Sequence, residues 1–259
     1  MGNTIKDNLI LAVETSSRIG SVAIAAGGEV LAEATFSVPL RHSAEIFTAI
    51  RDLLDRFGRR PREVEQVHIS AGPGSFTGLR IAATFAKTMH LANAARIVAV
   101  DTLDVIAANV IDLADEDTYP ASDPDLQAIG HERVAAIVDA KRGQFFIAVY
   151  ERRTPGGQQV AAGCGWVKVG SDSLMSAEQF LTEFVLEEKP IWLLGDGLLY
   201  YKDKFQADGI RFFDERYWSP RAGKVHLLGR QMALKGQFAD PVTLTPNYLR
   251  RPDVKIKTF

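Results

Sequence analysis

Two polar turns that follow strand-like apolar runs have the composition of a phosphate-binding loop. The first turn, Glu14-Thr15-Ser16-Ser17, follows the apolar run 9–13, and the second, Asp139 to Gln144, follows the apolar run 134–138. Hydroxyl groups and exposed backbone N–H groups in such turns form a concave set of donors for an anion, and arginine pairs well with phosphate. Ordinary turns whose polar groups bond to their own backbone have the same composition, so both interpretations stay open. The candidate nucleotide-binding residues here are Glu14, Thr15, Ser16, Ser17, Asp139, Arg142 and Gly143.

A third turn, Gly195-Asp196-Gly197, follows the short apolar run 191–194. Glycine lets the backbone approach a flat ligand closely, which would suit the adenosine of a nucleotide. A plain strand-to-helix turn explains the same three residues. Gly195, Asp196 and Gly197 are therefore further candidates for nucleotide binding.

The most distinctive string of the chain is Gly72-Pro73-Gly74-Ser75-Phe76-Thr77-Gly78-Leu79-Arg80. It follows a predicted strand and opens a predicted helix, whose N-terminus is able to bind an anion. It is neither a G-x-G-x-x-G fingerprint nor a P-loop, because no Lys-Ser/Thr pair follows the last glycine. The two glycines near the helix start indicate close approach of another helix, or tight packing within the chain.

The composition indicates a folded globular protein and excludes several special classes. The chain has 259 residues, of which 46% are apolar, and its 30 Lys+Arg against 32 Asp+Glu give no overall drive toward nucleic acid or membrane. The five histidines form no H-x-x-H or H-x-x-x-H pair, so a metal site is not expected. Cys164 has no partner for a disulfide, and the polar N-terminus has no signal peptide, which favours a cytosolic protein.

The charges are nevertheless segregated along the chain. Residues 101–132 contain nine acidic residues and no Lys or Arg, and residues 211–259 contain ten Lys+Arg against four acids. The basic region contacts a nucleic-acid backbone, or it is a solvated helix face with a loose tail. Its cations are Arg211, Arg216, Arg221, Lys224, Arg230, Lys235, Arg250, Arg251, Lys255 and Lys257.

The hydrophobic periodicity predicts the order βββαβα twice. In the first unit, strands are expected at 9–13, 21–25, 30–36, 67–70 and 97–100, with helices capped by Ser43 and Ser75 and a third helix over 102–113. In the second unit, strands are expected at 134–138, 145–150, 160–169, 191–194 and 210–213. Helices are expected from the Ser176 cap to 187, over 198–205 and over 220–235.

This duplication predicts an α/β protein with the two-lobed actin-like/sugar-kinase/Hsp70 fold, in which two strand-turn-strand hairpins grip nucleotide phosphates. The expected division is an N-terminal lobe over 1–111, an acidic linker or loop over 112–132 and a C-terminal lobe over 133–259. Glu14 departs from the aspartate that kinases of this fold usually carry there. An ATP-binding small-molecule kinase or ATPase is accordingly the alternative function.

Three strings together resemble the TsaB (YeaZ) family: residues 9–24, 70–80 and 139–144, supported by Arg41-His42-Ser43 and by 246–250. The resemblance implies a cytoplasmic, non-catalytic subunit of the complex that makes N6-threonylcarbamoyladenosine at position 37 of tRNA (t6A37). It implies docking on the catalytic subunit TsaD, a role for the ATPase TsaE, a homodimer through the same surface, and contact with tRNA only through the complex. No membrane contact and no certain cofactor are implied, although ATP or ADP at the complex interface is compatible with the family.

The same resemblance places the docking surface on two helices of the first unit. Glycine, alanine and threonine on one side of a helix allow close packing against another helix, which agrees with this assignment. The candidate partner-binding residues are Ile46, Phe47, Ile50, Ser75, Phe76, Thr77, Gly78, Leu79, Arg80, Ile81 and Thr84.

Overall fold

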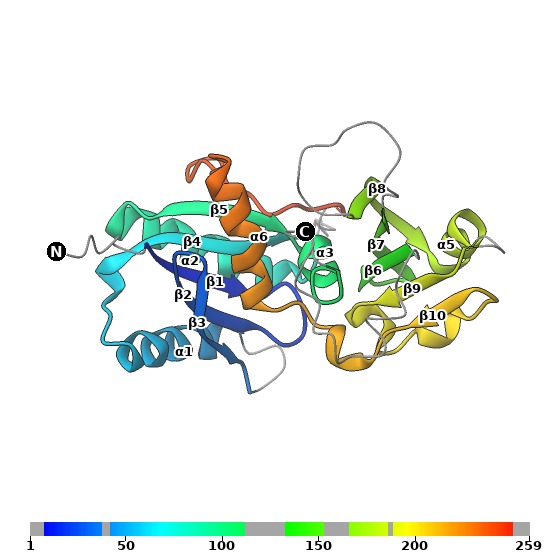
Figure 1. Cartoon of the computed structure of the whole chain (residues 1–259), viewed down its shortest axis with the longest axis horizontal. Coiled ribbons are helices and arrows are strands. Elements are labelled where there is room, and N and C mark those ends of the chain that lie inside the picture. Colours follow the sequence, from blue (N-terminus) through cyan, green and yellow to red (C-terminus); the bar gives the residue numbers. More distant parts are fainter. Residues whose placement is uncertain (1–7, 38–41, 112–132, 153–165, 186–188, 251–259) are drawn as a thin grey trace, which may run out of the picture.

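A computed structural model of the chain describes residues 8–37, 42–111, 133–152, 166–185 and 189–250. The expected acidic linker 112–132 therefore lies outside the described residues. Figure 1 shows two lobes side by side, each built on its own sheet. The expected two-lobed α/β fold is confirmed.

The first sheet has five strands in the order β3-β2-β1-β4-β5. The first three strands pair antiparallel as a meander, whereas β1, β4 and β5 run parallel. The strands are β1 (Leu9–Glu14), β2 (Ser21–Ala26), β3 (Glu29–Thr35), β4 (Val64–Gly72) and β5 (Arg96–Asp101).

The second sheet repeats this plan in the order β10-β9-β6-β7-β8. Its first three strands again pair antiparallel and its last two run parallel to the central strand, so the duplication predicted from the sequence holds at the level of the sheets. The strands are β6 (Arg133–Asp139), β7 (Gln144–Arg152), β8 (Trp166–Ser176), β9 (Ile191–Leu194) and β10 (Ile210–Phe212). The prediction that the third strand ends at 169 was wrong, because pairing with β7 continues to Ser176.

Three helices belong to the first half of the chain: α1 (His42–Arg56), α2 (Phe76–Asn93) and α3 (Thr102–Ala107). Ser75 caps α2 as predicted, since its hydroxyl accepts from the N–H of Gly78. Ser43 does not cap α1, because the helix already begins at His42. The predicted helix over 102–113 is much shorter, because the side chain of Asn109 donates to the carbonyls of Tyr217 and Ser219 and anchors a turn there.

In the second half, α5 (Ala177–Phe184) begins at the predicted cap, where Ser176 and Gln179 form a reciprocal capping box. The predicted helix over 198–205 was wrong, because two 3₁₀ turns, Asp196–Leu198 and Lys202–Phe205, replace it. These turns direct Phe205 into the core, where it packs edge-on against Phe145 and Phe180. Further 3₁₀ turns lie at Pro61–Glu63 and Glu215–Tyr217.

Two helices connect the lobes. The last helix, α6 (Ala222–Leu234), crosses the first sheet in front of β1, β4 and β5, whereas α3 lies between the sheets and packs both on β6 and β7 of the second sheet and on β4 and β5 of the first (Figure 1). The division into residues 1–111 and 133–259 stays a prediction, and these helices pack across it. His226 of α6 stacks on His68 of β4 with ring centroids 5.5 Å apart, and both rings are buried.

Alternation along β1 explains the two covered faces of the first sheet. Leu11 and Val13 point to the side of α1 and α2, while Ala12 points to the opposite side and packs with Val225 of α6. Side chains of a strand alternate between faces, so a strand buried on both sides is apolar throughout, as the run 9–13 is.

The chain then returns across both lobes as a C-terminal strap, defined here as residues 239–250. The N–H of Ala239 donates to the carbonyl of Ile97 at 2.8 Å, and Leu244 is buried in the first core. Leu249 packs against the second core. The strap therefore ties the first lobe to the second. Across the described ranges of the chain, the helices are too short or too polar to cross a membrane.

Candidate functional site

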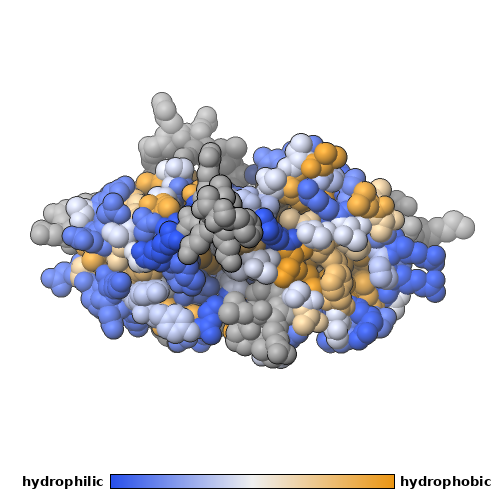
Figure 2. Space-filling view, turned by 180° about the vertical axis from the view of Figure 1, so that it is seen from behind, coloured by the Kyte–Doolittle hydropathy of each residue, from blue (hydrophilic) through white to orange (hydrophobic). Residues whose placement is uncertain are grey.

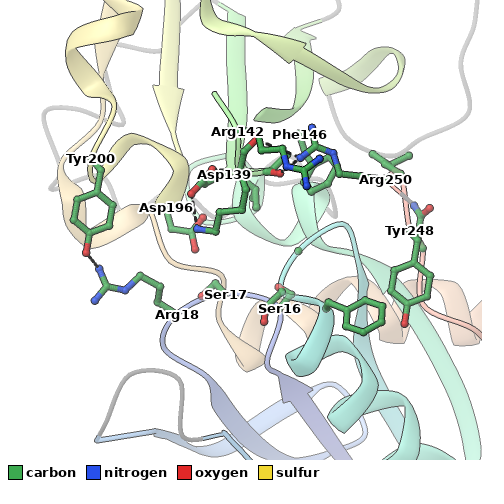
Figure 3. A pocket seen from close by; sticks show the side chains of 18 residues that line it. Ser16, Ser17, Arg18, Asp139, Arg142, Phe146, Asp196, Tyr200, Tyr248 and Arg250 are labelled. Carbon is green, nitrogen blue, oxygen red and sulfur yellow. Dashed lines mark hydrogen bonds and ion pairs between the residues drawn. The ribbon is translucent and has the colours of Figure 1, made fainter. Parts of the chain in front are cut away.

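A cavity of about 670 Å³ lies between the two lobes, where the first strands of both sheets end. Figure 3 shows Ser16 and Ser17 on one side of it, facing Asp139 and Arg142 on the other. Asp196 also lines this cavity. The structure thus brings together five of the residues predicted to bind nucleotide, from three turns that are far apart in the sequence.

Two residues of the first turn do not reach the cavity. Glu14 is fully buried behind it, and its carboxylate accepts from the N–H of Ser16 at 2.5 Å, from the Ser16 hydroxyl at 2.6 Å and from the hydroxyl of Ser70. Burial raises the pKa of Glu14, against the lowering effect of these donors. Thr15 is also fully buried, and its hydroxyl donates to the carbonyl of Gly78 at 2.8 Å. Both residues hold the turn in shape and are not placed to touch a ligand.

The second turn is held by its own side chains. Asp139 accepts from the backbone N–H of Lys141 at 2.7 Å and from the Lys141 ammonium at 2.6 Å. Lys141, Arg142 and Gly143 have φ angles of 65°, 58° and 73°, so three successive residues are left-handed. Gly143 supplies this conformation at the turn and does not line the cavity.

The glycines of the third turn pack against protein backbone and not against a ligand. A Cβ at Gly195 would lie 2.8 Å from the backbone nitrogen of Ile137, and one at Gly197 would lie 2.9 Å from that of Asp139. Asp196 between them faces the cavity, and burial, followed by the charge of Glu14, raises its pKa to about 7. Strand β6 occupies the space where a side chain at Gly195 or Gly197 would lie, and neither glycine lines the cavity, so the adenosine contact of these two residues stays a prediction.

Several side chains that complete the cavity were not predicted from the sequence to lie there. Arg18 donates to the hydroxyl of Tyr200 at one edge, and Tyr248 of the strap packs on Phe76 at the other, with ring centroids 5.2 Å apart. Phe146 and Arg250 also line the cavity. The carbonyls of Ala140 and Lys141 accept from the Arg250 guanidinium at 2.6 and 3.3 Å, so the strap clamps the second turn. The lining thus carries four cationic side chains against two carboxylates.

The distinctive string 72–80 packs within the chain. A Cβ at Gly74 would lie 2.5 Å from the carbonyl oxygen of Ser16, and one at Gly78 would overlap the carbonyl of Thr15. The N–H of Ser75 donates to the Ser16 carbonyl at 2.7 Å. These glycines let the start of α2 sit directly on the first turn, so the tight packing within the chain that the sequence left open is present. Ser75 and Phe76, expected to bind a partner, line the cavity.

Four other residues expected to bind a partner lie in this chain's own core. Ile46, Ile50, Gly78 and Leu79 are buried between the sheet and the helices and are unable to contact a partner directly. Phe47, by contrast, is 64% exposed and packs edge-on against Phe85 of α2. The expected residues that remain at the surface away from the cavity are Phe47, Thr77, Arg80, Ile81 and Thr84, called the α1/α2 face below.

The α1/α2 face lies on the side of the first sheet opposite α6. Figure 2 shows this side of the molecule from behind, with apolar side chains gathered over the first lobe. Leu91, near the end of α2, is 85% exposed and extends the apolar surface along the helix. An apolar surface on neighbouring helices is typical of a protein contact.

The basic C-terminal region does not form one patch in the described residues. Arg221 pairs with Glu33 at 3.1 Å, Arg211 lies over the ring of Trp192, and Arg250 clamps the second turn. Arg251, Lys255 and Lys257 lie outside the described residues. Arg211, Arg221 and Arg250 thus lie on different elements of the two lobes, and each contacts another residue of the chain.

The chain is similar to known proteins over nearly its whole length. The family model described as TsaD, tRNA N6-adenosine threonylcarbamoyltransferase, matches residues 30–257. The tRNA threonylcarbamoyladenosine biosynthesis protein TsaB of Bacillus subtilis (strain 168) is 26% identical over 254 residues, covering 96% of each chain. The protein of the same name from Escherichia coli (strain K12) is 25% identical over 242 residues, covering 93% of this chain and 94% of that protein. The solved structure of YeaZ from Pseudomonas aeruginosa shares the fold, with a TM-score of 0.70 at 23% identity, over 93% of this chain and all of that one.

Proposed function

Because the chain belongs to the tRNA N6-adenosine threonylcarbamoyltransferase (TsaD) family, and to the TsaB (YeaZ) proteins within it, we propose that it serves t6A37 biosynthesis as a non-catalytic subunit. In this role it binds the catalytic subunit TsaD and keeps it competent for transfer. The complex acts on tRNA in the cytoplasm, and this chain reaches the tRNA only through the complex.

The observation that carries this proposal is the α1/α2 face. Phe47 exposes most of its ring beside the half-buried Ile81, next to the small side chains of Thr77 and Thr84. An exposed phenylalanine among small residues is typical of a helix-to-helix contact, since the small residues let the partner approach. We assign TsaD to this face. A second copy of the chain competes for it, and TsaE joins next to the contact.

The proposed non-catalytic role is supported by the hydrogen bonds of two carboxylates, Glu14 and Asp139. Glu14 is buried and hydrogen-bonded behind the cavity, and both oxygens of Asp139 accept from Lys141. In the described part of the chain, no three His, Cys, Asp or Glu residues are arranged to hold a metal ion. Glu14 does not reach the cavity and both oxygens of Asp139 are hydrogen-bonded, so neither is placed as a general base. Asp196 lines the cavity with one unpartnered oxygen and is the carboxylate that the kinase or ATPase alternative would need.

Binding between this chain and TsaD, purified from the same source, tests the proposal. Phe47→Asp and Thr77→Arg place a charge on the α1/α2 face and are expected to weaken binding at least about tenfold, as unpaired buried charges do. Leu234→Asp is the matched control, because Leu234 is 73% exposed at the end of α6 on the opposite side of the sheet. The proposal fails if the wild-type chain forms no complex in gel filtration, or if all three variants bind equally well.

A homodimer is tested with the same variants. If the chain pairs with itself through the α1/α2 face, Phe47→Asp shifts its sedimentation coefficient toward the monomer, and addition of TsaD dissociates the wild-type pair. A dimer that survives both treatments uses another surface.

The cavity favours a second candidate function, the binding of a nucleoside phosphate such as ATP or ADP. Two hydroxyl-bearing residues, Ser16 and Ser17, face Arg142 across a space of the size of a small-molecule site. We propose binding without turnover, and the kinase or ATPase alternative differs from it by predicting hydrolysis. Calorimetric titration with ATP, followed by a phosphate-release assay, separates the two.

A further inference from the structure

At the cavity, Asp139 is paired with Lys141 and Glu14 is buried and hydrogen-bonded, while four cationic side chains line the cavity wall. We propose that this cavity binds the phosphate groups of its ligand without a divalent cation, with the ammonium group of Lys141 in the place that the cation would take. The inference rests on the nucleoside phosphate binding proposed above and specifies how that ligand is neutralised.

Asp139 is the carboxylate best placed to hold a cation, and Lys141 already occupies it. One oxygen accepts from the backbone N–H and the other from the ammonium group, at 2.7 and 2.6 Å. A divalent cation binds carboxylate oxygens at about 2.0–2.6 Å, and so would stand directly against the ammonium charge. The chain has thus placed its own cation on the aspartate.

The two other carboxylates do not offer a better ligand. Glu14 is fully buried beneath the first turn, where Ser16 and Ser70 donate to its two oxygens. Asp196 lines the cavity with one oxygen that has no hydrogen-bond partner. Burial, followed by the charge of Glu14, raises its pKa to about 7, so this carboxyl group is protonated more readily than an ordinary aspartate and is then able to donate a hydrogen bond to an anion.

The backbone of the second turn is built to present cations to the cavity. Lys141 and Arg142 are left-handed, a conformation that residues other than glycine rarely adopt and that persists only where the surroundings hold it. Here the holding group is Arg250, which donates to the carbonyls of Ala140 and Lys141. Lys141 is 79% exposed at its side chain, so the ammonium group stays accessible while it pairs with Asp139.

The remaining lining fits a nucleoside phosphate. Arg18 and Arg142 add positive charge from opposite lobes (Figure 3), and the aromatic side chains of Phe76, Tyr200 and Tyr248 also line the cavity. Arginine pairs with phosphate through two parallel hydrogen bonds. Charge for the phosphates is therefore available from side chains on both sides of the cavity.

The test uses the full chain and the fluorescent nucleotide N-methylanthraniloyl-ADP, titrated once with magnesium and once with EDTA. We expect the wild-type Kd to differ less than about twofold between the two buffers. Lys141→Met is expected to weaken binding about tenfold or more in EDTA, the loss of one charge-assisted hydrogen bond. Magnesium is expected to restore part of that affinity, because the substitution frees the Asp139 oxygen that accepts from the ammonium group.

Lys235→Met is the matched control, since Lys235 is exposed after the end of α6 and does not line the cavity. Circular dichroism and the melting temperature verify that both variants are folded. Wild-type binding that disappears in EDTA overturns the inference but leaves nucleotide binding standing, and so does Lys141→Met binding that equals wild type in EDTA. If the wild type binds in neither buffer, nucleotide binding fails as well, whereas docking on TsaD is judged separately by gel filtration.

Discussion

Replacing Gly78 by alanine tests the contact between α2 and the first turn. A Cβ at this position would lie 2.8 Å from the carbonyl carbon of Thr15 and would overlap its oxygen. The neighbouring atoms belong to backbone and not to the end of a flexible side chain, so the helix and the turn must move apart. That movement also stretches the hydrogen bond from the Thr15 hydroxyl to the Gly78 carbonyl, which is 2.8 Å long.

The expected loss follows from opposing contributions to the free energy of unfolding. Alanine is a better helix former than glycine by about 1 kcal/mol, which favours the variant. Overpacking against backbone costs about 3 kcal/mol, at the upper end of its usual range, and a lost buried hydrogen bond costs about 1 kcal/mol. We therefore expect Gly78→Ala to lower the free energy of unfolding by about 3 kcal/mol.

Urea denaturation followed by circular dichroism measures this change. Thr77→Ala is the control, because Thr77 is exposed on the same turn of α2, and its change is expected to stay within about 0.5 kcal/mol. A Gly78→Ala variant as stable as the wild type, or more stable, refutes the reasoning, because helix propensity would then outweigh the contact.

Three further outcomes are expected. Burial lowers the pKa of His68 to about 3 and of His226 to about 4, so at these two residues only the unfolded state takes up protons just below about pH 6.5, and their contribution to stability falls from pH 7 to pH 5. Relative to the wild type, His226→Gln should therefore gain stability between pH 7 and pH 5, measured by urea denaturation at both pH values, and an unchanged difference between the two proteins would contradict the assignment. Arg250→Ala should increase amide hydrogen exchange over residues 140–144, measured by mass spectrometry, while an unchanged rate would show that the strap does not hold that turn. Ile46→Ala should cost about 2–5 kcal/mol of stability and Phe47→Ala about 0.5 kcal/mol or less, and equal losses would contradict the assignment of Ile46 to the core.

The duplicated strand order was predictable because each strand of the pattern carries its own signal. The run 9–13 is apolar throughout, and Gly27-Gly28 marks the turn between the next two strands. Polar residues at the ends of the first strands then had to meet at one edge of each sheet, which explains why Ser16 and Asp139 face the same cavity. The turns that follow the first strand of each sheet were therefore predictable from the sequence pattern.

The placement of α3 and α6 was not predictable in this way. An amphipathic pattern indicates that one face of a helix is buried, but not which sheet buries it. The same limit applies at the α1/α2 face, where Ile46 and Phe47 are neighbours in sequence and only the packing decides that one is core and the other surface. Gly78 carries a signal for close approach, and its partner, Thr15, is 63 residues away.

The position of α6 has a consequence for the order in which the two lobes are able to fold during synthesis. The side of the first sheet that contains Ala12 and Val98 is covered by α6, which leaves the ribosome after all ten strands. The first lobe therefore waits for the second before its apolar face is covered, and the strap follows last. Neither half is expected to be expressed as a stable fragment. A chain that stops before residue 222 leaves one face of the first sheet uncovered and lacks the strap that joins the lobes, so its first lobe is expected to be unstable.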